Sequence, residues 1–190
     1  MLIKRSVPVM GAVVLTALLV PAAVYAAQDS PARPAIEQTD VPTLDGGLSH
    51  QALVTARRSP LARTAVQLYQ PFETGDVSIY RRILTADFTD VPLAPKQQPG
   101  RHGMALHVLN DIVATFPDAR FHIEAIHVDR NVVTVRGLFT GTQEGDFLGV
   151  PATHRQLSYR TVDIHQFRGG RIHRTDHLED FFGAYQQMTR

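Results

Sequence analysis

A ten-residue stretch near the C-terminus, RIHRTDHLED (residues 171–180), concentrates side chains that could do chemistry. It holds two histidines, two arginines and three carboxylates. Neighbouring imidazole and carboxylate groups can transfer protons near neutral pH, bind a metal ion, or form a solvated strand edge. The secondary structure that carries them decides among these possibilities.

The spacing of the two histidines argues against a shared metal ion. The alternating pattern around them predicts a β-strand, on which His173 and His177 share a face but lie ~13 Å apart at ~3.3 Å per residue. The carboxylates of the stretch complete no metal-binding spacing either. We therefore predict no metal site here.

The composition excludes several other chemistries. The chain has 190 residues and no cysteine, so thiol nucleophiles and thiolate metal ligands are excluded. Beyond residue 26 the single lysine is Lys96, in the loop PLAPKQQPG, a setting that does not favour a Schiff base. The sequence contains no Gly-x-Ser-x-Gly elbow, phosphate-binding loop or dinucleotide fingerprint.

The first 26 residues have the features of a secretory signal peptide. Lys4 and Arg5 precede an almost wholly apolar run over residues 7–20. Val24 and Ala26 are the small residues that favour cleavage after Ala26. The run is short for a membrane span, which needs ~20 residues. We predict a secreted or periplasmic protein with no stable membrane insertion after cleavage.

A flexible linker over residues 27–48, rich in Pro, Asp, Gln and Gly, is predicted to follow the signal peptide and to precede a domain over residues 49–190. Cleavage would remove two of the 19 basic residues and none of the 18 acidic ones, leaving a net charge of −1. Proteins that bind nucleic acids carry an excess of positive charge, which this net charge lacks, so we expect no nucleic-acid partner.

In the first half of the domain, apolar residues recur at spacings of three and four, which predicts amphipathic helices. One runs from residue 61, and GDVSIYRRIL, N-capped by Asp76, forms another. A third covers residues 101–116 and is stopped by Pro117. Between the last two, DFTDVPLAPKQQPG is typical of a proline-bounded loop.

The second half changes to a period of two, which predicts strands. The expected strands are FHIEAIHVD, VVTVRGLFTGT, LSYRTVDIHQF and the stretch after Gly169-Gly170, and DFFGAYQQM is expected to be a short closing helix. Helices followed by antiparallel strands indicate an α+β fold with the helices on one face of a curved sheet.

The register of the last hairpin decides which side chains share a face. A two-residue turn at Gly169-Gly170 would place Asp163 opposite Asp176, and like charges directly opposite are unfavourable. A three-residue loop over residues 169–171 avoids this clash, and we predict it. The pairs are then Asp163 with His177, His165 with Thr175, and Phe167 with His173.

The predicted register collects a mixed polar face, made of Tyr159, Thr161, Asp163, His165, Thr175 and His177. If this face points toward the helices it lines a pocket, in which His177 would transfer a proton and Asp163 would orient and charge its imidazole. The alternative, which the residues alone leave open, is a structural cross-strand pair near solvent.

Most of the domain also resembles a known family. The matching features are Gly75-Asp76, Phe116-Pro117-Asp118, Thr140-Gly141-Thr142, Gly149-Val150-Pro151 and Gly170-Arg171-Ile172. Each is unspecific alone, but their order and spacing over residues 64–188 resemble the SnoaL-like polyketide cyclases, also called ester cyclases.

This resemblance implies a nuclear-transport-factor-2-like fold, a cone of about three helices wrapped by a strongly curved antiparallel sheet around a pocket. Such proteins are commonly dimers, so a homodimer is expected. The family's cyclases close a ring by an intramolecular aldol reaction, without metal or cofactor. A small-molecule substrate or ligand is therefore implied.

The resemblance also suggests site residues. Aligned through Gly170-Arg171-Ile172, the family's acid/base aspartate on the last strand is His177 here, and a histidine on the preceding strand is Asp163. A glutamine position corresponds to Thr161, and an early polar pocket position to Asp90. The aspartate and the histidine are thus exchanged between the two strands.

Two functions remain possible. A cofactor-free enzyme would remove a proton α to a carbonyl with His177, oriented by Asp163. Arg136 could stabilise the resulting anion or be a solvated charge on the outer face. A secreted binding protein would instead hold an apolar ligand without turnover. Its pocket wall, unless these residues are plain core, would be Leu109, Phe116, Leu138, Phe139 and Phe167.

Overall fold

The computed structural model describes residues 41–190, so the predicted signal peptide and residues 27–40 of the predicted linker lie outside the described residues. The helices are α1 (His50–Arg58), α2 (Pro60–Gln67), α3 (Gln70–Thr74), the 3₁₀ turn η1 (Val77–Ile79), α4 (Tyr80–Ile83), α5 (Gly100–His107), the π-helical η2 (Val108–Val113) and α6 (Phe181–Thr189). Within residues 41–190, no helix has the length and apolar character needed to cross a membrane.

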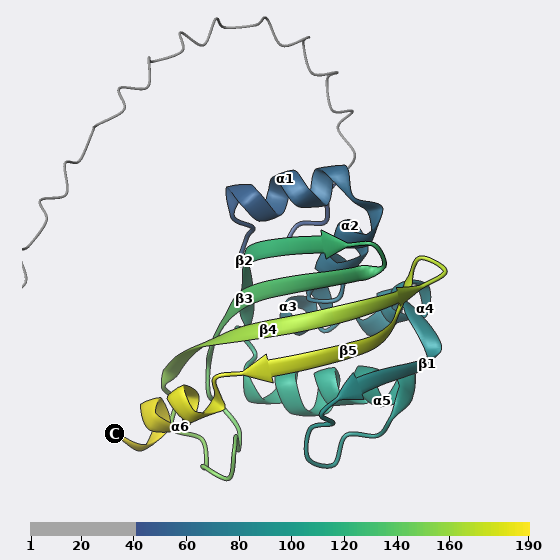
Figure 1. Ribbon diagram of the computed structural model, residues 1–190. Helices are drawn as coiled ribbons and strands as arrows, with labels where there is room; N and C mark the ends of the chain where they lie inside the picture. The colour runs from purple at the N-terminus through teal and green to yellow at the C-terminus, as the bar shows by residue number, and fades with distance from the viewer. Residues whose placement is uncertain (1–40) are drawn as a thin grey trace, which may run out of the picture. The chain divides into compact units, whose positions relative to one another are not determined.

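A five-stranded sheet forms the other layer of the described part. Its strands are β1 (Leu84–Val91), β2 (Arg120–Asp129), β3 (Val132–Thr142), β4 (Gln156–Arg168) and β5 (Arg171–Glu179), in the order β1-β5-β4-β3-β2. In Figure 1, α2 to α5 lie behind the sheet, α1 lies beside the edge strand β2, and α6 follows β5. The predicted α+β fold, with helices on one face of the sheet, is confirmed.

Two serines cap the first helices, and the small buried residues of α1 explain why this helix was not predicted. Ser49 caps α1 through the N–H of Ala52, and Ser59 ends α1 and caps α2 through the N–H of Ala62. The buried residues of α1 are Ala52 and Ala56. Small alanines give a weak apolar stripe, so periodicity alone carries little signal for this helix.

The segment predicted to be a loop before α5, residues 87–100, begins inside strand β1, so that prediction was wrong for residues 87–91. β1 runs parallel to β5, so the sheet is mixed rather than wholly antiparallel. Its burial pattern is irregular, and the register with β5 shifts between Leu84 and Thr89. A strand without regular alternation escapes a period-two analysis. The consequence is that Asp90 lies opposite Thr175.

The last hairpin combines parts of both registers considered. Asp163 pairs with His177 and His165 with Thr175, as predicted. The turn itself has two residues, not three, because Arg168 pairs with Arg171. Gly169 and Gly170 have φ of 58° and 75°, which suits the positive-φ turn favoured by two-residue hairpins. A β-bulge makes the two-residue turn compatible with the predicted pairs further along the strands. Phe167 pairs with Ile172 and Gln166 with Arg174, so His173 is the extra residue of the bulge.

Packing in the core fixes the side chain of Tyr69, which lies between α2 and α3, against the sheet. The ring of Phe121 stacks on Tyr69 with centroids 4.2 Å apart. Position 137 must be glycine for this, because a Cβ there would lie 2.2 Å from Cε1 of Phe121. Tyr69, which follows α2, is thereby held over the inner face of the sheet.

Residues 41–48, at the end of the predicted linker, contact the domain. Leu44 is buried, and Leu48 forms a bridge with Ile123 of β2. The backbone N–H groups of Asp45 and Gly46 donate to the carboxylate of Glu73, at 2.6 and 3.0 Å. This segment therefore packs along the β2 side of the described domain.

Candidate active site

A row of polar side chains lies on the inner face of β4. Alternation along the strand buries every second residue, and between Leu157 and Phe167 the inward ones are Tyr159, Thr161, Asp163 and His165. Thr175 of β5 and Asp90 of β1 are buried beside this row. The polar face predicted from the sequence therefore faces the helices and not solvent.

Three of these groups form one continuous hydrogen-bonded chain with Tyr69 of the helical layer. The hydroxyl of Tyr69 lies 2.9 Å from Oδ2 of Asp163 and 3.0 Å from Nε2 of His165. Nδ1 of His165 lies 2.9 Å from the hydroxyl of Thr175. The chain links the helical layer to β4 and β5, and Asp163 stands at its end.

Asp163 is poised to change its protonation state. Burial raises the pKa of its carboxyl to about 7, against the hydrogen bond from Tyr69, which lowers it. Oδ2 accepts from Tyr69 and, at 3.4 Å, from Thr161. Within residues 41–190, both of these hydrogen bonds go to Oδ2, and no donor bonds Oδ1. Oδ1 is therefore the oxygen that is free to take up a proton.

His165 is a neutral member of this chain. It is completely buried, and burial lowers its pKa to about 3. A neutral imidazole has one N–H donor and one acceptor nitrogen, and both nitrogens have a hydroxyl neighbour here.

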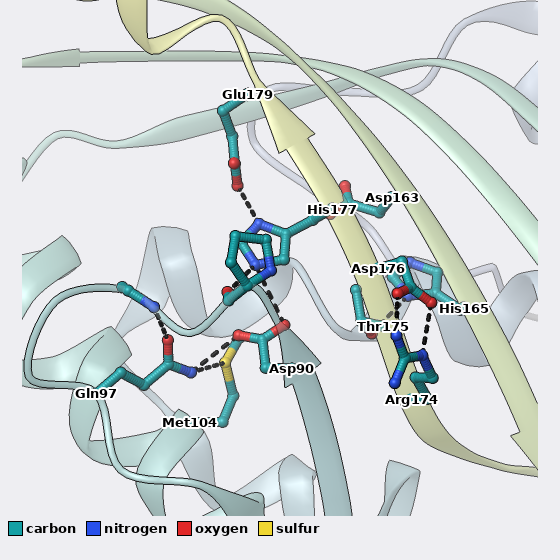
Figure 2. A network of polar contacts seen from close by, with 12 residues as sticks. Asp90, Gln97, Met104, Asp163, His165, Arg174, Thr175, Asp176, His177 and Glu179 are labelled. Atoms are coloured by element: carbon teal, nitrogen blue, oxygen red, sulfur yellow. Dashed lines mark hydrogen bonds and ion pairs between the residues drawn. The ribbon is translucent and has the colours of Figure 1, made fainter.

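His177 is held in its charged form by two acceptors. Nδ1 donates to a carboxylate oxygen of Glu179 at 2.6 Å, and Nε2 to the carbonyl of Pro92 at 2.7 Å. Neither a carbonyl nor an ionised carboxylate can donate, so both nitrogens carry protons. Burial alone would lower the pKa of His177, but the Glu179 hydrogen bond and the charge of Asp90 outweigh it and raise the pKa to about 9. Figure 2 shows the ring between Glu179 and Asp90.

Asp90 completes this second group. Oδ1 of Asp90 lies 3.5 Å from Nε2 of His177, and Oδ2 accepts from Nε2 of Gln97 at 2.8 Å. Gln97 is fixed in turn by the N–H of Ala94, at 2.8 Å (Figure 2). Burial raises the pKa of Asp90, opposed by Gln97 and His177.

The structure gives His177 a different orienting partner from the one expected. Asp163 lies directly opposite His177 across the strands, but it bonds Tyr69 and Thr161, while His177 bonds Glu179 and Pro92. Sequence reasoning missed Tyr69, Gln97 and Glu179. Glu179 follows His177 by two residues on the same strand, so period-two alternation places both on one face and could have identified it.

Two residues expected to contact substrate have other surroundings. Arg136 lies on the outer face, half exposed and 3.2 Å from Glu124, because Val135 and Gly137 take the inward positions. Phe116 is core, packed edge-on against Phe139 and Phe147 with centroids 5.1 and 5.0 Å away.

Tyr159, also expected to contact substrate, lies on the inner face of β4 and stacks on Phe139 at 4.9 Å. Burial raises the pKa of its hydroxyl. That hydroxyl has no hydrogen-bond partner within residues 41–190 and is not fully buried. Tyr159 therefore combines an aromatic wall with an available hydroxyl.

The apolar wall expected for a binding protein is dispersed. Phe139 and Phe167 are buried core residues, and Leu109 is exposed. Leu138 occupies one of the half-buried positions of β3, between Gly137 and Phe139. These residues do not line one surface.

A separate cleft of about 530 Å³ lies on the helical side. Its lining runs over residues 75–81 and 101–105 and contains none of the polar residues described above. We place the candidate site at the polar row, where the titratable groups gather. Among residues 41–190, no group of three or more histidine and carboxylate side chains is arranged to hold a metal ion.

Comparison with known proteins identifies one family. The family model described as SnoaL-like polyketide cyclase matches residues 63–188. A Bacillus cereus ATCC 10987 protein described as a polyketide cyclase is 25% identical, with a TM-score of 0.59 over 68% of this chain and 80% of its own. IdmH from Streptomyces antibioticus is also 25% identical, with a TM-score of 0.58 over 68% of this chain and 99% of its own.

A SnoaL-like polyketide cyclase from Agrobacterium tumefaciens C58 shares the fold at 18% identity, with a TM-score of 0.58 over 67% of this chain and 97% of its own. No functionally curated protein matches the chain.

Replacing Glu179 by Gln tests the ion pair that charges His177. Without the carboxylate, we expect the pKa of His177 to fall from about 9 toward or below its usual value of 6.5. An NMR titration of the ring measures this. Glu144→Gln is the matched control, because Glu144 holds a different histidine, His154, at the surface.

The same substitution has a consequence for stability. The folded-state pKa of His177 is raised, so its ion pair stabilises the fold fully below pH 6.5, and this stabilisation is lost as the pH rises through about 9. Glu179→Gln should therefore destabilise the protein more at pH 6 than at pH 9.5 in urea unfolding. An equal loss at both pH values would contradict the assigned charge.

Proposed function

The chain belongs to the SnoaL-like polyketide cyclase family, and from that premise we propose that it is an acid/base enzyme needing no cofactor. Its substrate would be a small, partly apolar carbonyl compound, and the reaction an aldol-type cyclisation or an isomerisation. The observation that carries the proposal is the pair of opposed strand positions, Asp163 and His177, one a buried carboxylate and the other a fixed imidazolium.

Asp163 is the better base of the two. A general base works best with a pKa near the operating pH, and that of Asp163 is about 7. Among residues 41–190, no donor bonds its Oδ1, because both hydrogen bonds go to Oδ2. His177 has both nitrogens protonated and engaged, so it has no lone pair to offer. The base and the charged partner thus take the reverse of the roles assigned from the sequence.

The proposed step moves one proton and leaves one negative charge. Oδ1 of Asp163 takes the proton from the carbon next to a carbonyl, and the bonding electrons form the enolate. The positive charge of His177 offsets the enolate charge in a poorly hydrated interior. The protonated Asp163 then returns the proton to the product oxygen in an aldol closure, or to another carbon in an isomerisation.

Polar groups along the same row would position the substrate. Tyr159 and Thr161 precede Asp163 on the inner face of β4, and the Tyr159 hydroxyl is unpaired among the described residues. The stacked rings of Phe139 and Tyr159 supply an apolar wall. These features suit a substrate with an apolar body and several oxygens.

Deuterium uptake α to a carbonyl tests the proposed step. With 1-indanone and related aryl ketones in D₂O, the protein should accelerate exchange, and Asp163→Asn should reduce the rate ~10²–10⁴-fold. Asp87→Asn removes an exposed carboxylate paired with Arg168 and should leave the rate unchanged. Full activity of Asp163→Asn would reject Asp163 as the base. Ligand binding without exchange by the wild type would favour the binding protein.

The pH profile of that exchange should be bell-shaped. Activity requires Asp163 deprotonated and His177 protonated, so the rate should rise near pH 7 and fall near pH 9. A profile that keeps rising through pH 10 would contradict a role for the imidazolium.

We also propose that the protein is exported after cleavage behind Ala26. The support is the sequence alone: two basic residues, the apolar run over residues 7–20, and small residues before the cleavage point. N-terminal sequencing of the protein recovered outside the cytoplasm should begin at Ala27. An intact Met1 in that fraction would argue against the proposal.

A homodimer is proposed through the outer face of the sheet. Val162 and Leu178 lie opposite each other there, Leu178 is 75% exposed, and Ile164 follows on β4. Leu178→Glu should shift the mass measured by light scattering from dimer to monomer, whereas Leu93→Glu, at an exposed site outside the strands, should not. A monomeric wild type would refute this interface.

A further inference from the structure

We infer that Tyr69, His165 and Thr175 form a positioning chain that decides which oxygen of Asp163 takes up the proton. Oδ2 is held as a permanent acceptor, and Oδ1 is the oxygen that reacts. The inference deepens the proposed function and rests on Asp163 as its base. Its geometric basis is the unbroken series of contacts from Thr175 to Asp163.

The direction of the chain follows from counting donors. An ionised carboxylate only accepts, so the Tyr69 hydroxyl donates to Oδ2. That hydroxyl has one hydrogen, and it must therefore accept from Nε2 of His165. His165 then carries its proton on Nε2, and its bare Nδ1 accepts from the Thr175 hydroxyl. Every donor in the chain points toward Asp163.

A second donor reinforces the difference between the two oxygens. Thr161 also directs its hydroxyl at Oδ2, at 3.4 Å. A proton placed on Oδ2 would face the hydrogens of Tyr69 and Thr161, and it would force the buried His165 to exchange its tautomer. A proton on Oδ1 disturbs none of these contacts. Both protonation states of Asp163 are thus accommodated without moving a side chain.

Other titratable groups face Asp163 and act on its charge without selecting an oxygen. Glu179 of β5 and Asp90 of β1 disfavour the carboxylate, and His177 of β5 favours it. Tyr69 is the group from the helical layer, and its hydrogen bond favours the carboxylate. Among residues 41–190, only Tyr69 and Thr161 bond an individual oxygen, so the selection belongs to them and to the residues that orient Tyr69.

The tautomer of His165 is the direct readout. Two-bond ¹H–¹⁵N correlation spectra distinguish the two neutral tautomers and the imidazolium. We expect the Nε2–H form at every pH from 5 to 9, while the ¹³C carboxyl signal of Asp163 titrates within that range. His177, with both nitrogens protonated at neutral pH, is an internal reference. An Nδ1–H form, or a tautomer change that follows the titration of Asp163, would overturn the inference.

Tyr69→Phe tests the link that joins the chain to Asp163. Losing this donor should raise the titration midpoint of Asp163 and shift the acidic limb of the exchange profile by the same amount. Tyr80→Phe is the matched control, because Tyr80 is also a buried tyrosine but its hydroxyl lies 3.3 Å from the Leu68 carbonyl. An unmoved midpoint in Tyr69→Phe would refute the role of Tyr69.

The NMR measurements need no substrate, so they separate two kinds of failure. A fixed Nε2–H tautomer with no ketone exchange would reject the proposed enzyme and keep the chain. Exchange that depends on Asp163 with a switching tautomer would keep the enzyme and reject the chain. If Tyr69→Phe does not fold, the tautomer in the wild type still decides the question.

Discussion

Burying a carboxylate costs free energy unless other groups compensate for the lost water, and the organisation of this site follows from that cost at Asp163. Tyr69 and Thr161 stabilise one oxygen of Asp163 by hydrogen bonding, and the positive charge of His177 partly offsets the negative charge of the carboxylate. The compensation is incomplete, which leaves the pKa near 7. A fully compensated carboxylate would be too weak a base, and an uncompensated one would stay protonated.

Three features of the fold, a bulge, a parallel strand and a glycine, bring the groups that act on the charge of Asp163 close to it. The bulge at His173 lets a tight glycine turn coexist with a register that sets Asp163 against His177. The parallel strand β1 brings Asp90 to the same edge. Gly137 admits the ring of Phe121, which holds Tyr69 over the sheet. The hydroxyl of Tyr69 thus joins the helical layer to Asp163 and His165 of β4.

The inner face of β4 was accessible from the sequence, because that strand alternates regularly between buried and more exposed residues. Alternation placed Asp163, His165, Thr175 and His177 on one face. The repulsion expected between Asp163 and Asp176 selected the register that pairs Asp163 with His177. Strand β1 was missed because its burial is irregular, and Tyr69 because its spacing fits an apolar stripe. The roles of Asp163 and His177 depend on desolvation and on acceptors such as the Pro92 carbonyl, which lies 85 residues away in the chain. No local pattern encodes such contacts.

Neutron diffraction on crystals at pH 8 would test the charge assignment most directly, since it locates protons on individual atoms. Our account predicts deuterium on both nitrogens of His177, none on either oxygen of Asp163, and the Tyr69 hydroxyl deuteron directed at Oδ2. A bare nitrogen on His177 together with a deuteron on Asp163 would contradict the account, because the base and the cation would then have exchanged roles.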